Sequence, residues 1–279
     1  MCARPAPAPD ADPRDLAALA ADVAARAGDL LLEGWHRRRR FVATKSTGTD
    51  MVSEMDHASE RLIVSALLAD RPDDGVVGEE GTARPGTSGV RWVVDPLDGT
   101  TNYLYGIPGW AVSIAAEAAG GEPGRGVIAG AVLDPAHGEL FLATQGGGAT
   151  CNGAAIACSD QDRLDLALLA TGFGYDPVRR RAQAKVLAGL IGEVRDIRRH
   201  GAAAVDLCSV ACGRVDGYYE RGLAWWDHAA GALVATEAGA VVSSLDGGPP
   251  HEGSIVAAAP GIAVPLRDRL SALGANAVP

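Results

Sequence analysis

Two aspartates stand at the end of an apolar segment in the first half of the chain. The sequence WVVDPLDGTTNY occupies residues 92–103, so a proline and a leucine separate Asp95 from Asp98. Pro96 restricts the backbone, and a turn there would bring both carboxylates to the same side. Two carboxylates held close together repel each other unless cations lie between them. The spacing therefore predicts a cation site, with the carbonyl oxygen of Leu97 as a further ligand.

The two residues that follow could bind an anion. Gly99 lets the backbone approach a ligand closely, and the N–H groups of Gly99 and Thr100 can point at an anionic group. The alternative for this segment, taken alone, is a type I turn in which the aspartates make only local hydrogen bonds.

Further acidic residues occur where predicted elements begin or end. Glu79 and Glu80 follow an apolar pair and a glycine, and Asp227 follows two tryptophans at the start of a predicted helix. Either position alone is typical of a solvated loop or a helix N-terminus. In layered α/β proteins, however, the ends of elements gather at one crevice. Together with the two aspartates above, these acids predict an all-oxygen site, which suits Mg²⁺ better than Zn²⁺.

Hydrophobic periodicity and turn residues indicate the elements that would position these acids. Helices are predicted from Pro13 to about residues 35–40, from Ser53, from residue 177, over 201–212, over 226–238 and after 260. Strands are predicted at 76–77, 90–94, 110–117, 127–133, 139–143, 164–170, 194–197, 215–220, 240–243 and 254–258. This order predicts an α/β protein of layered sheets and helices.

Composition and charge exclude several classes of protein. The chain has 279 residues, with 25 Lys and Arg against 35 Asp and Glu and a net charge of −10. This acidic balance argues against binding of nucleic acid or of an anionic membrane through bulk charge. No apolar segment approaches the roughly 20 residues that a membrane span requires. The first residues lack the basic start and apolar stretch of a secretory signal, which predicts a cytoplasmic protein.

The same features predict the domain organisation. Residues 1–12 are rich in proline and alanine and are expected to form a disordered tail. Residues 13–279 show no internal linker and are expected to form a single catalytic domain. We expect it to consist of two closely packed halves, at about 13–150 and 151–279.

The acidic segments, in this order, resemble the inositol monophosphatase family, the Mg²⁺-dependent, lithium-sensitive phosphatases. The resemblance extends from about Leu16 to about Ala259. It is carried by four blocks, at residues 45–56, 78–80, 95–103 and 226–231. The segment at 198–220 is similar to the bacterial inositol-1-monophosphatases, and the Ala- and Arg-rich composition is typical of actinobacterial members.

The resemblance implies a five-layered α-β-α-β-α sandwich of the inositol monophosphatase and fructose-1,6-bisphosphatase type, usually a homodimer. It implies hydrolysis of phosphate monoesters, with myo-inositol 1-phosphate giving myo-inositol and phosphate. Carried over position by position, it implies that Glu79, Asp95 and the Leu97 carbonyl hold one Mg²⁺. Asp95, Asp98 and Asp227 would hold a second.

The resemblance also implies a substrate site. The residues that it assigns to substrate binding are Asp98, Gly99, Thr100, Gly201, Ala202, Glu220 and Asp227. Lys45 and Asp50 belong to a segment that would lie over the site and help to hold a third, weaker Mg²⁺. Ala202 departs from the family, because many members have Thr or Ser there, and this affects substrate preference rather than hydrolysis.

The reaction that follows is attack on phosphorus by a metal-activated water. Glu79 and the Thr100 hydroxyl would orient this water and accept its proton, and Asp227 would position the water that protonates the leaving group. No covalent phosphoenzyme is expected, since nothing in the sequence resembles an activated nucleophile.

Three alternatives compete with this interpretation. Phosphatases of the haloacid dehalogenase type use an Asp nucleophile in D-x-D-G-T, but here two residues separate Asp95 from Asp98. The same metal residues would serve fructose-1,6-bisphosphate, a 3′-phosphoadenosine nucleotide, histidinol phosphate or NADP phosphate. The short segment between Glu80 and Asp95, together with Glu220, favours a small polyol monophosphate. A role as a partner protein in transcription or RNA processing is the third alternative, although the net negative charge offers no basic face for RNA.

Overall fold

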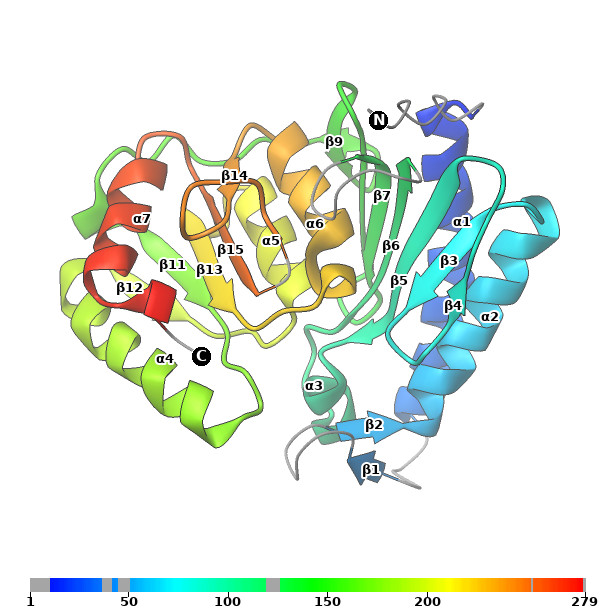
Figure 1. Cartoon of the computed structure of the whole chain (residues 1–279), viewed down its shortest axis with the longest axis horizontal. Coiled ribbons are helices and arrows are strands. Elements are labelled where there is room, and N and C mark those ends of the chain that lie inside the picture. The colour runs from blue at the N-terminus through cyan, green and yellow to red at the C-terminus, as the bar shows by residue number, and fades with distance from the viewer. Residues whose placement is uncertain (1–10, 37–41, 45–50, 119–125, 252, 278–279) are drawn as a thin grey trace, which may run out of the picture.

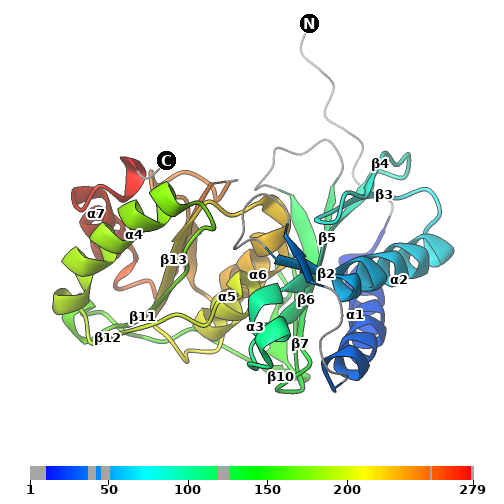
Figure 2. The same ribbon diagram turned by 90° about the horizontal axis from the view of Figure 1, so that it is seen from below.

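The computed structural model describes residues 11–36, 42–44, 51–118, 126–251 and 253–277. It shows a mixed α/β fold built around two sheets that face each other (Figure 1). Helices lie between the sheets and on the outer face of each, in the order α-β-α-β-α (Figures 1 and 2). The predicted layered fold is therefore confirmed.

The first sheet belongs to the N-terminal part of the chain. Its eight strands have the order β10-β9-β8-β7-β6-β5-β3-β4, and they are antiparallel except for β3 and β5. The elements of this part are α1 (Pro13–His36), β1 (Val42–Thr44), β2 (Met51–Ser53), α2 (Glu54–Asp70), β3 (Gly75–Gly78), β4 (Ala83–Arg84), β5 (Val90–Asp98), α3 (Thr100–Tyr105), β6 (Ala111–Ala118), β7 (Val127–Asp134), β8 (Glu139–Thr144), β9 (Gly148–Cys151) and β10 (Ala154–Ala155).

The second sheet belongs to the C-terminal part. Its five strands have the order β12-β11-β13-β15-β14, with β11 parallel to both of its neighbours. The elements are a 3₁₀ segment (Leu164–Leu166), β11 (Leu168–Thr171), α4 (Pro177–Leu190), β12 (Asp196–Arg198), α5 (Ala203–Ala211), β13 (Gly217–Arg221), α6 (Trp225–Glu237), β14 (Val241–Ser243), β15 (Ser254–Ala258) and α7 (Ala263–Ala272).

Three apolar cores correspond to the layers. One lies between α1, α2 and the first sheet, one between α4, α7 and the second sheet, and the largest surrounds α5 and α6 between the sheets. Strand β5 contributes to two of them, because Val93 faces α5 and α6 while Trp92 and Val94 face α1 and α2. The sequence of a strand that is buried on both faces is a nearly continuous apolar segment, and the sequence of β5 up to Val94 fits this pattern.

Two local predictions needed correction. The turn expected at Pro96 is instead part of β5, which continues to Asp98 with a shift of register against β6 between Asp95 and Asp98. Such a bulge re-aims side chains without ending the strand. The strand predicted from Leu164 begins only at Leu168, because the preceding residues form the 3₁₀ segment.

Most of the predicted N-terminal tail lies outside the described residues. Asp12 is described, and it accepts hydrogen bonds from N–H groups in the first turn of α1.

The division of the catalytic domain into two halves stays a prediction. Within the described residues, no helix is long and apolar enough to span a membrane.

The close packing of α5 against α6 depends on a glycine. A Cβ on Gly231 would lie 2.9 Å from Leu207 Cβ and 3.4 Å from Ala204 Cα, so a side chain there would push the helices apart. We expect Gly231→Val to lower the free energy of unfolding by about 2 kcal/mol through overpacking, measured by urea denaturation.

Gly192→Val is the matched control, because a Cβ on Gly192 would meet no atom within 4 Å. Its free energy of unfolding should change by about 0.5 kcal/mol or less. Equal effects of the two substitutions would contradict this account of helix packing.

Candidate active site

The predicted acidic residues, except Glu80, meet at one cleft between the two parts of the chain. Its volume is about 600 Å³, and its walls come from segments on both sides of the division between the sheets. The predicted site residues that line it are Glu79, Asp95, Leu97, Asp98, Gly99, Thr100, Gly201, Glu220 and Asp227. The fold therefore brings together residues that are separated by more than half the length of the chain, such as Glu79 and Asp227.

The bulge of β5 places the first two carboxylates. Asp95 is buried, and its Oδ1 accepts a hydrogen bond of 3.0 Å from the Leu97 N–H. Asp98 Oδ2 accepts a bond of 2.7 Å from the N–H of Ala204 in the first turn of α5. The start of α5 is thereby tied to the end of β5, and the two aspartates lie at the same end of the strand.

Helix α6 supplies the third carboxylate from its first turn. Asp227 accepts a hydrogen bond of 2.7 Å from the Ala224 N–H, which fixes the entry of the chain into the helix. Trp225 is buried, and its Nε1 donates to Glu117 Oε2 at 3.1 Å. A carboxylate in the first turn also interacts favourably with the helix dipole.

A buried glutamate that the sequence analysis missed supports the turn that carries Glu79. Glu60 in α2 accepts hydrogen bonds from the N–H of Glu80 at 2.8 Å and from the N–H and hydroxyl of Thr82 at 3.1 and 2.6 Å. Glu79 itself donates its N–H to the Val94 carbonyl at 3.2 Å. The only local signal for Glu60 was its place on the apolar face of a predicted helix.

The Thr100 hydroxyl lies between two acceptors. Its oxygen is 2.9 Å from Asp56 Oδ1 and 3.1 Å from the Leu97 carbonyl oxygen, and Asp56 is fully buried. A hydroxyl donates its one proton and can also accept hydrogen bonds with its lone pairs, so the Thr100 hydroxyl can accept one from a water molecule. This arrangement can orient a water in the cleft.

Burial and mutual repulsion both raise the pKa values of the carboxylates in the cleft. Burial raises the pKa of Asp95 well above its usual value, and the charges of Glu79 and Asp98 raise it further. Burial raises the pKa of Asp98 to about 8, against the opposing effect of the Ala204 N–H. The pKa of Asp227 is also raised, first by burial and then by Glu79 and Asp98. These carboxylates need positive charge to ionise together.

The donor set fits divalent cations. Within the described residues, no ion pair with Lys, Arg or His reaches Asp95, Asp98 or Asp227. The charge of Glu79 helps to raise the pKa of Asp95, so these two carboxyl groups lie close together. No three His, Cys, Asp or Glu side chains of the described residues surround a metal-sized point in this conformation. The oxygen donors are nevertheless of the kind that divalent cations such as Mg²⁺ prefer.

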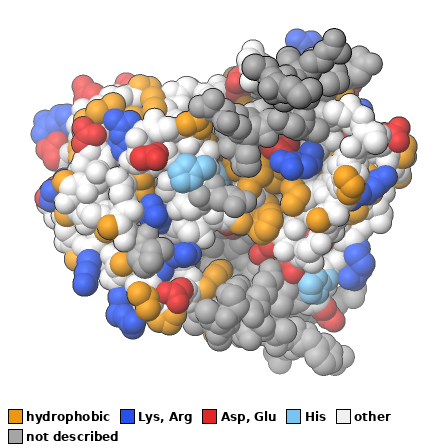
Figure 3. Space-filling view, viewed as in Figure 1, with side chains coloured by type: hydrophobic (Ala, Val, Ile, Leu, Met, Phe, Trp, Pro, Cys, Tyr) orange, Lys and Arg blue, Asp and Glu red, His pale blue; other side chains and the backbone are white. Residues whose placement is uncertain are grey.

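The opposite wall of the cleft holds Glu220 and two arginines. The pKa of Glu220 is raised to about 7 by burial, although Tyr218 Oη donates to its Oε2 at 2.6 Å. Arg179 and Arg199 also line the cleft, and neither was predicted. Figure 3 shows Lys and Arg side chains spread over the part of the surface that carries α4, on the left of the view. The cleft is thus acidic on one wall and mixed in charge on the other.

Comparison with known proteins identifies the fold family. The model of the inositol monophosphatase family matches residues 12–275. The chain belongs to the inositol monophosphatase family. It is therefore a phosphatase, and the family is metal-dependent.

Individual relatives agree with this assignment. An inositol-1-monophosphatase of Mycobacterium leprae is 46% identical over 233 residues, which cover 80% of this chain and 78% of that protein. A Nus factor SuhB of Pasteurella multocida is 39% identical over 256 residues, covering 90% and 94%. The solved structure of the suhB extragenic suppressor protein of Bartonella henselae is 36% identical with a TM-score of 0.86, covering 92% of this chain and 98% of that one.

Three residues that the family resemblance assigns to the site are not among the described residues that line the cleft. Ala202 is 2% exposed and packs near Gly99, and among the described residues it is Ala203 that lines the cleft at this point. Lys45 and Asp50 lie outside the described residues. The roles assigned to individual side chains stay predictions of the inositol monophosphatase resemblance.

The raised pKa of Asp98 predicts how the free energy of unfolding depends on pH without metal. The unfolded chain releases the Asp98 proton near pH 4, whereas the folded protein keeps it up to about pH 8. The folded state binds the extra proton, so its free energy of unfolding falls as the pH rises between these values. In EDTA, we expect the melting temperature to fall from pH 5.5 to pH 8.5, and to fall less in Asp98→Asn.

Mg²⁺ should oppose this loss in the wild type, because a ligand that binds only the folded state raises its stability. The gain in melting temperature should be larger at pH 8 than at pH 6. Identical pH curves for wild type and Asp98→Asn would contradict the raised pKa of Asp98.

Proposed function

We propose that this phosphatase hydrolyses phosphate monoesters with Mg²⁺ as its cation, and that myo-inositol 1-phosphate is its preferred substrate. The observation that carries the proposal is the convergence of four carboxylates, from Glu79, Asp95, Asp98 and Asp227, on a single cleft. The name of the Mycobacterium leprae relative, at 46% identity, supports the choice of substrate.

The proposed ligands divide between two cations. Glu79, Asp95 and the Leu97 carbonyl would hold one, and Asp95, Asp98 and Asp227 would hold the other. When bound, the cations supply Lewis-acid activation of water and neutralise charge on the phosphate and leaving oxygens. An all-oxygen donor set matches the preference of Mg²⁺.

The chain's own groups perform the remaining tasks. Glu79 and the Thr100 hydroxyl orient the attacking water, and Glu79 takes its proton. Gly99 and Thr100 line the cleft, and their N–H groups would hold the phosphate. Asp227 positions the water that gives a proton to the leaving alkoxide.

We assign substrate preference to the wall of the cleft that contains Glu220. Glu220, oriented by Tyr218, accepts hydrogen bonds from substrate hydroxyls. Ala202, which the family resemblance assigns to substrate binding, supplies no hydroxyl and does not line the cleft among the described residues. Fructose-1,6-bisphosphate, a 3′-phosphoadenosine nucleotide, histidinol phosphate and NADP phosphate are the competing substrates for the same carboxylates. The homodimer, a third Mg²⁺ near Lys45 and Asp50, lithium sensitivity and the cytoplasmic location stay predictions.

A second candidate function follows from other relatives. Several proteins at 38–41% identity are named Nus factor SuhB. A partner-protein role in transcription or RNA processing would use the surface of the protein rather than the cleft, and the two functions are compatible. Protein contacts rather than RNA contacts are expected, because the net charge is −10.

Phosphate release from a panel of substrates tests the proposal. The panel contains myo-inositol 1-phosphate, fructose-1,6-bisphosphate, 3′-phosphoadenosine 5′-phosphate and histidinol phosphate, each with Mg²⁺ and with EDTA. We expect Mg²⁺-dependent release, fastest from myo-inositol 1-phosphate. Faster release from another substrate would retain the site and change the substrate, and no release by folded protein would favour the partner-protein role.

Loss of one carboxylate should nearly abolish turnover. In Asp98→Asn the side-chain oxygen can still accept the Ala204 N–H, so the fold should be kept while the negative charge is lost. We expect kcat to fall by about a hundredfold or more at saturating Mg²⁺. Asp165→Asn is the matched control, since Asp165 is exposed and, among the described residues, forms its ion pair with nearby Arg163. A kcat for Asp98→Asn near that of the control would refute the ligand assignment.

A further inference from the structure

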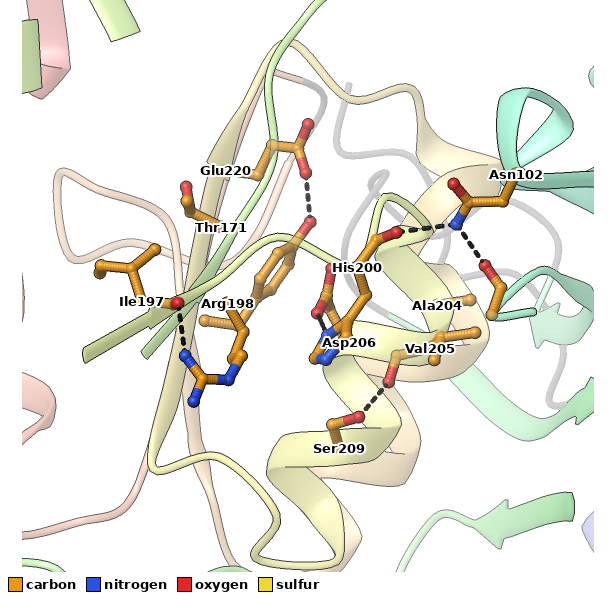
Figure 4. Close-up of polar contacts among 12 residues, drawn as sticks. Asn102, Thr171, Ile197, Arg198, His200, Ala204, Val205, Asp206, Ser209 and Glu220 are labelled. Carbon is orange, nitrogen blue, oxygen red and sulfur yellow. Dashed lines mark hydrogen bonds and ion pairs between the residues drawn. The ribbon is translucent and has the colours of Figure 1, made fainter. Parts of the chain in front are cut away.

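A histidine and an aspartate form a close pair beside the cleft. His200 Nδ1 lies 2.5 Å from Asp206 Oδ1 (Figure 4). The Asp206 side chain is 1% exposed, whereas that of His200 is 38% exposed. Arg199 and Gly201 line the cleft, whereas His200, which lies between them in the sequence, is not among the described lining residues. The pair is therefore adjacent to the cleft but not part of its described lining.

The hydrogen bond to His200 uses only one of the two carboxylate oxygens of Asp206. Its Oδ2 is buried and has no hydrogen-bond partner among the described residues. Burial raises the pKa of Asp206, and the nearby His200 and the N–H of Gly201 lower it. The hydrogen bond to Asp206 raises the pKa of His200. The other charged or titratable groups that face the pair are Arg198, Arg199, Asp98, Tyr218 and Glu220.

The main chain of His200 is held from the other part of the molecule. Asn102 Nδ2 donates hydrogen bonds of 2.7 Å to the carbonyl oxygens of His200 and Gly109 (Figure 4). Asn102 is 6% exposed and belongs to α3, which begins at Thr100 in the cleft. The segment before α5 is thus held by Asp206 through the His200 side chain and by Asn102 through the His200 carbonyl.

This segment presents its neighbours to the cleft. Gly201 has a φ of +95°, in the left-handed region that favours glycine. A Cβ on Gly201 would overlap the guanidinium of Arg199, which therefore lies directly against the glycine backbone. The position of Arg199 in the cleft depends on the conformation of these few residues.

We propose that His200 is a positioning residue for substrate binding: paired with Asp206, it holds residues 199–201 so that Arg199 and Gly201 form a preorganised wall of the cleft. The inference rests on the proposed phosphatase function and goes beyond it. His200 acts through its neighbours, so it affects substrate affinity and leaves the hydrolytic step to the carboxylates. Preorganisation of a binding wall lowers the ordering cost of binding.

A second pair of the same kind provides the control. His137 Nδ1 lies 2.7 Å from Asp134 Oδ2, with side-chain exposures of 51% and 3%. Asp134 is the last residue of β7 and His137 lies in the turn that follows, and neither is among the described residues that line the cleft. A substitution at His137 tests what the loss of such a pair does when no binding wall depends on it.

The experiment measures steady-state kinetics at saturating Mg²⁺ with the substrate that the panel selects. His200→Phe removes the donor to Asp206 and should raise KM about five- to tenfold, the effect of one lost charge-assisted hydrogen bond, with kcat within about twofold. His200→Gln keeps an N–H donor and should retain most of the affinity. His137→Phe should leave both KM and kcat unchanged.

The pH dependence separates positioning from simple packing. Below its raised pKa, the imidazolium of His200 balances the charge of Asp206, and above it that charge is unbalanced. The ratio of the wild-type KM to the KM of His200→Gln should therefore be below one near pH 6 and approach one near pH 9. Ionisation of the substrate affects both proteins equally and cancels in this ratio.

Each outcome decides the inference. An unchanged KM in His200→Phe, a loss in kcat without a change in KM, or a KM effect equal to that of His137→Phe would overturn it. If His200→Phe fails to fold by circular dichroism, the pH dependence of the ratio for His200→Gln decides, and a flat ratio overturns it. Absence of phosphate release by the wild type would instead refute the proposed function.

Discussion

Repulsion among four carboxylates in one cleft is the constraint on which the rest of this structure depends. Glu79, Asp95, Asp98 and Asp227 lie close enough for their charges to raise the pKa values of the three aspartates. Such a cluster is unfavourable in a folded protein unless cations compensate it. The scaffold must therefore hold the acids in place firmly enough that cation binding, rather than movement of the chain, relieves the repulsion.

Backbone N–H groups do much of this holding. The N–H of Leu97 binds Asp95, that of Ala204 binds Asp98, and that of Ala224 binds Asp227. Two of these donors lie at the starts of α5 and α6, where free N–H groups and the helix dipole favour negative charge. The helices between the sheets thus fix the carboxylates of β5 and α6 relative to one another.

The two walls of the cleft differ in composition. The carboxylate wall offers the oxygen donors that divalent cations prefer. The other wall contains Arg179, Arg199 and Glu220. In the proposed function, the first wall supports hydrolysis and the second sets the preference for substrate.

The sequence by itself determined the acids, the oxygen-ligand chemistry and most of the elements, since apolar periodicity reports directly which face of an element is buried. It did not determine that β5 continues through Pro96, because a bulge depends on pairing with β6. Nor did it reveal the support of Thr100 by Asp56 or the pairing of His200 with Asp206. Asn102 and His200 are 98 residues apart. Contacts across such separations have no local pattern, so only the tertiary structure decided which polar side chains surround the cleft.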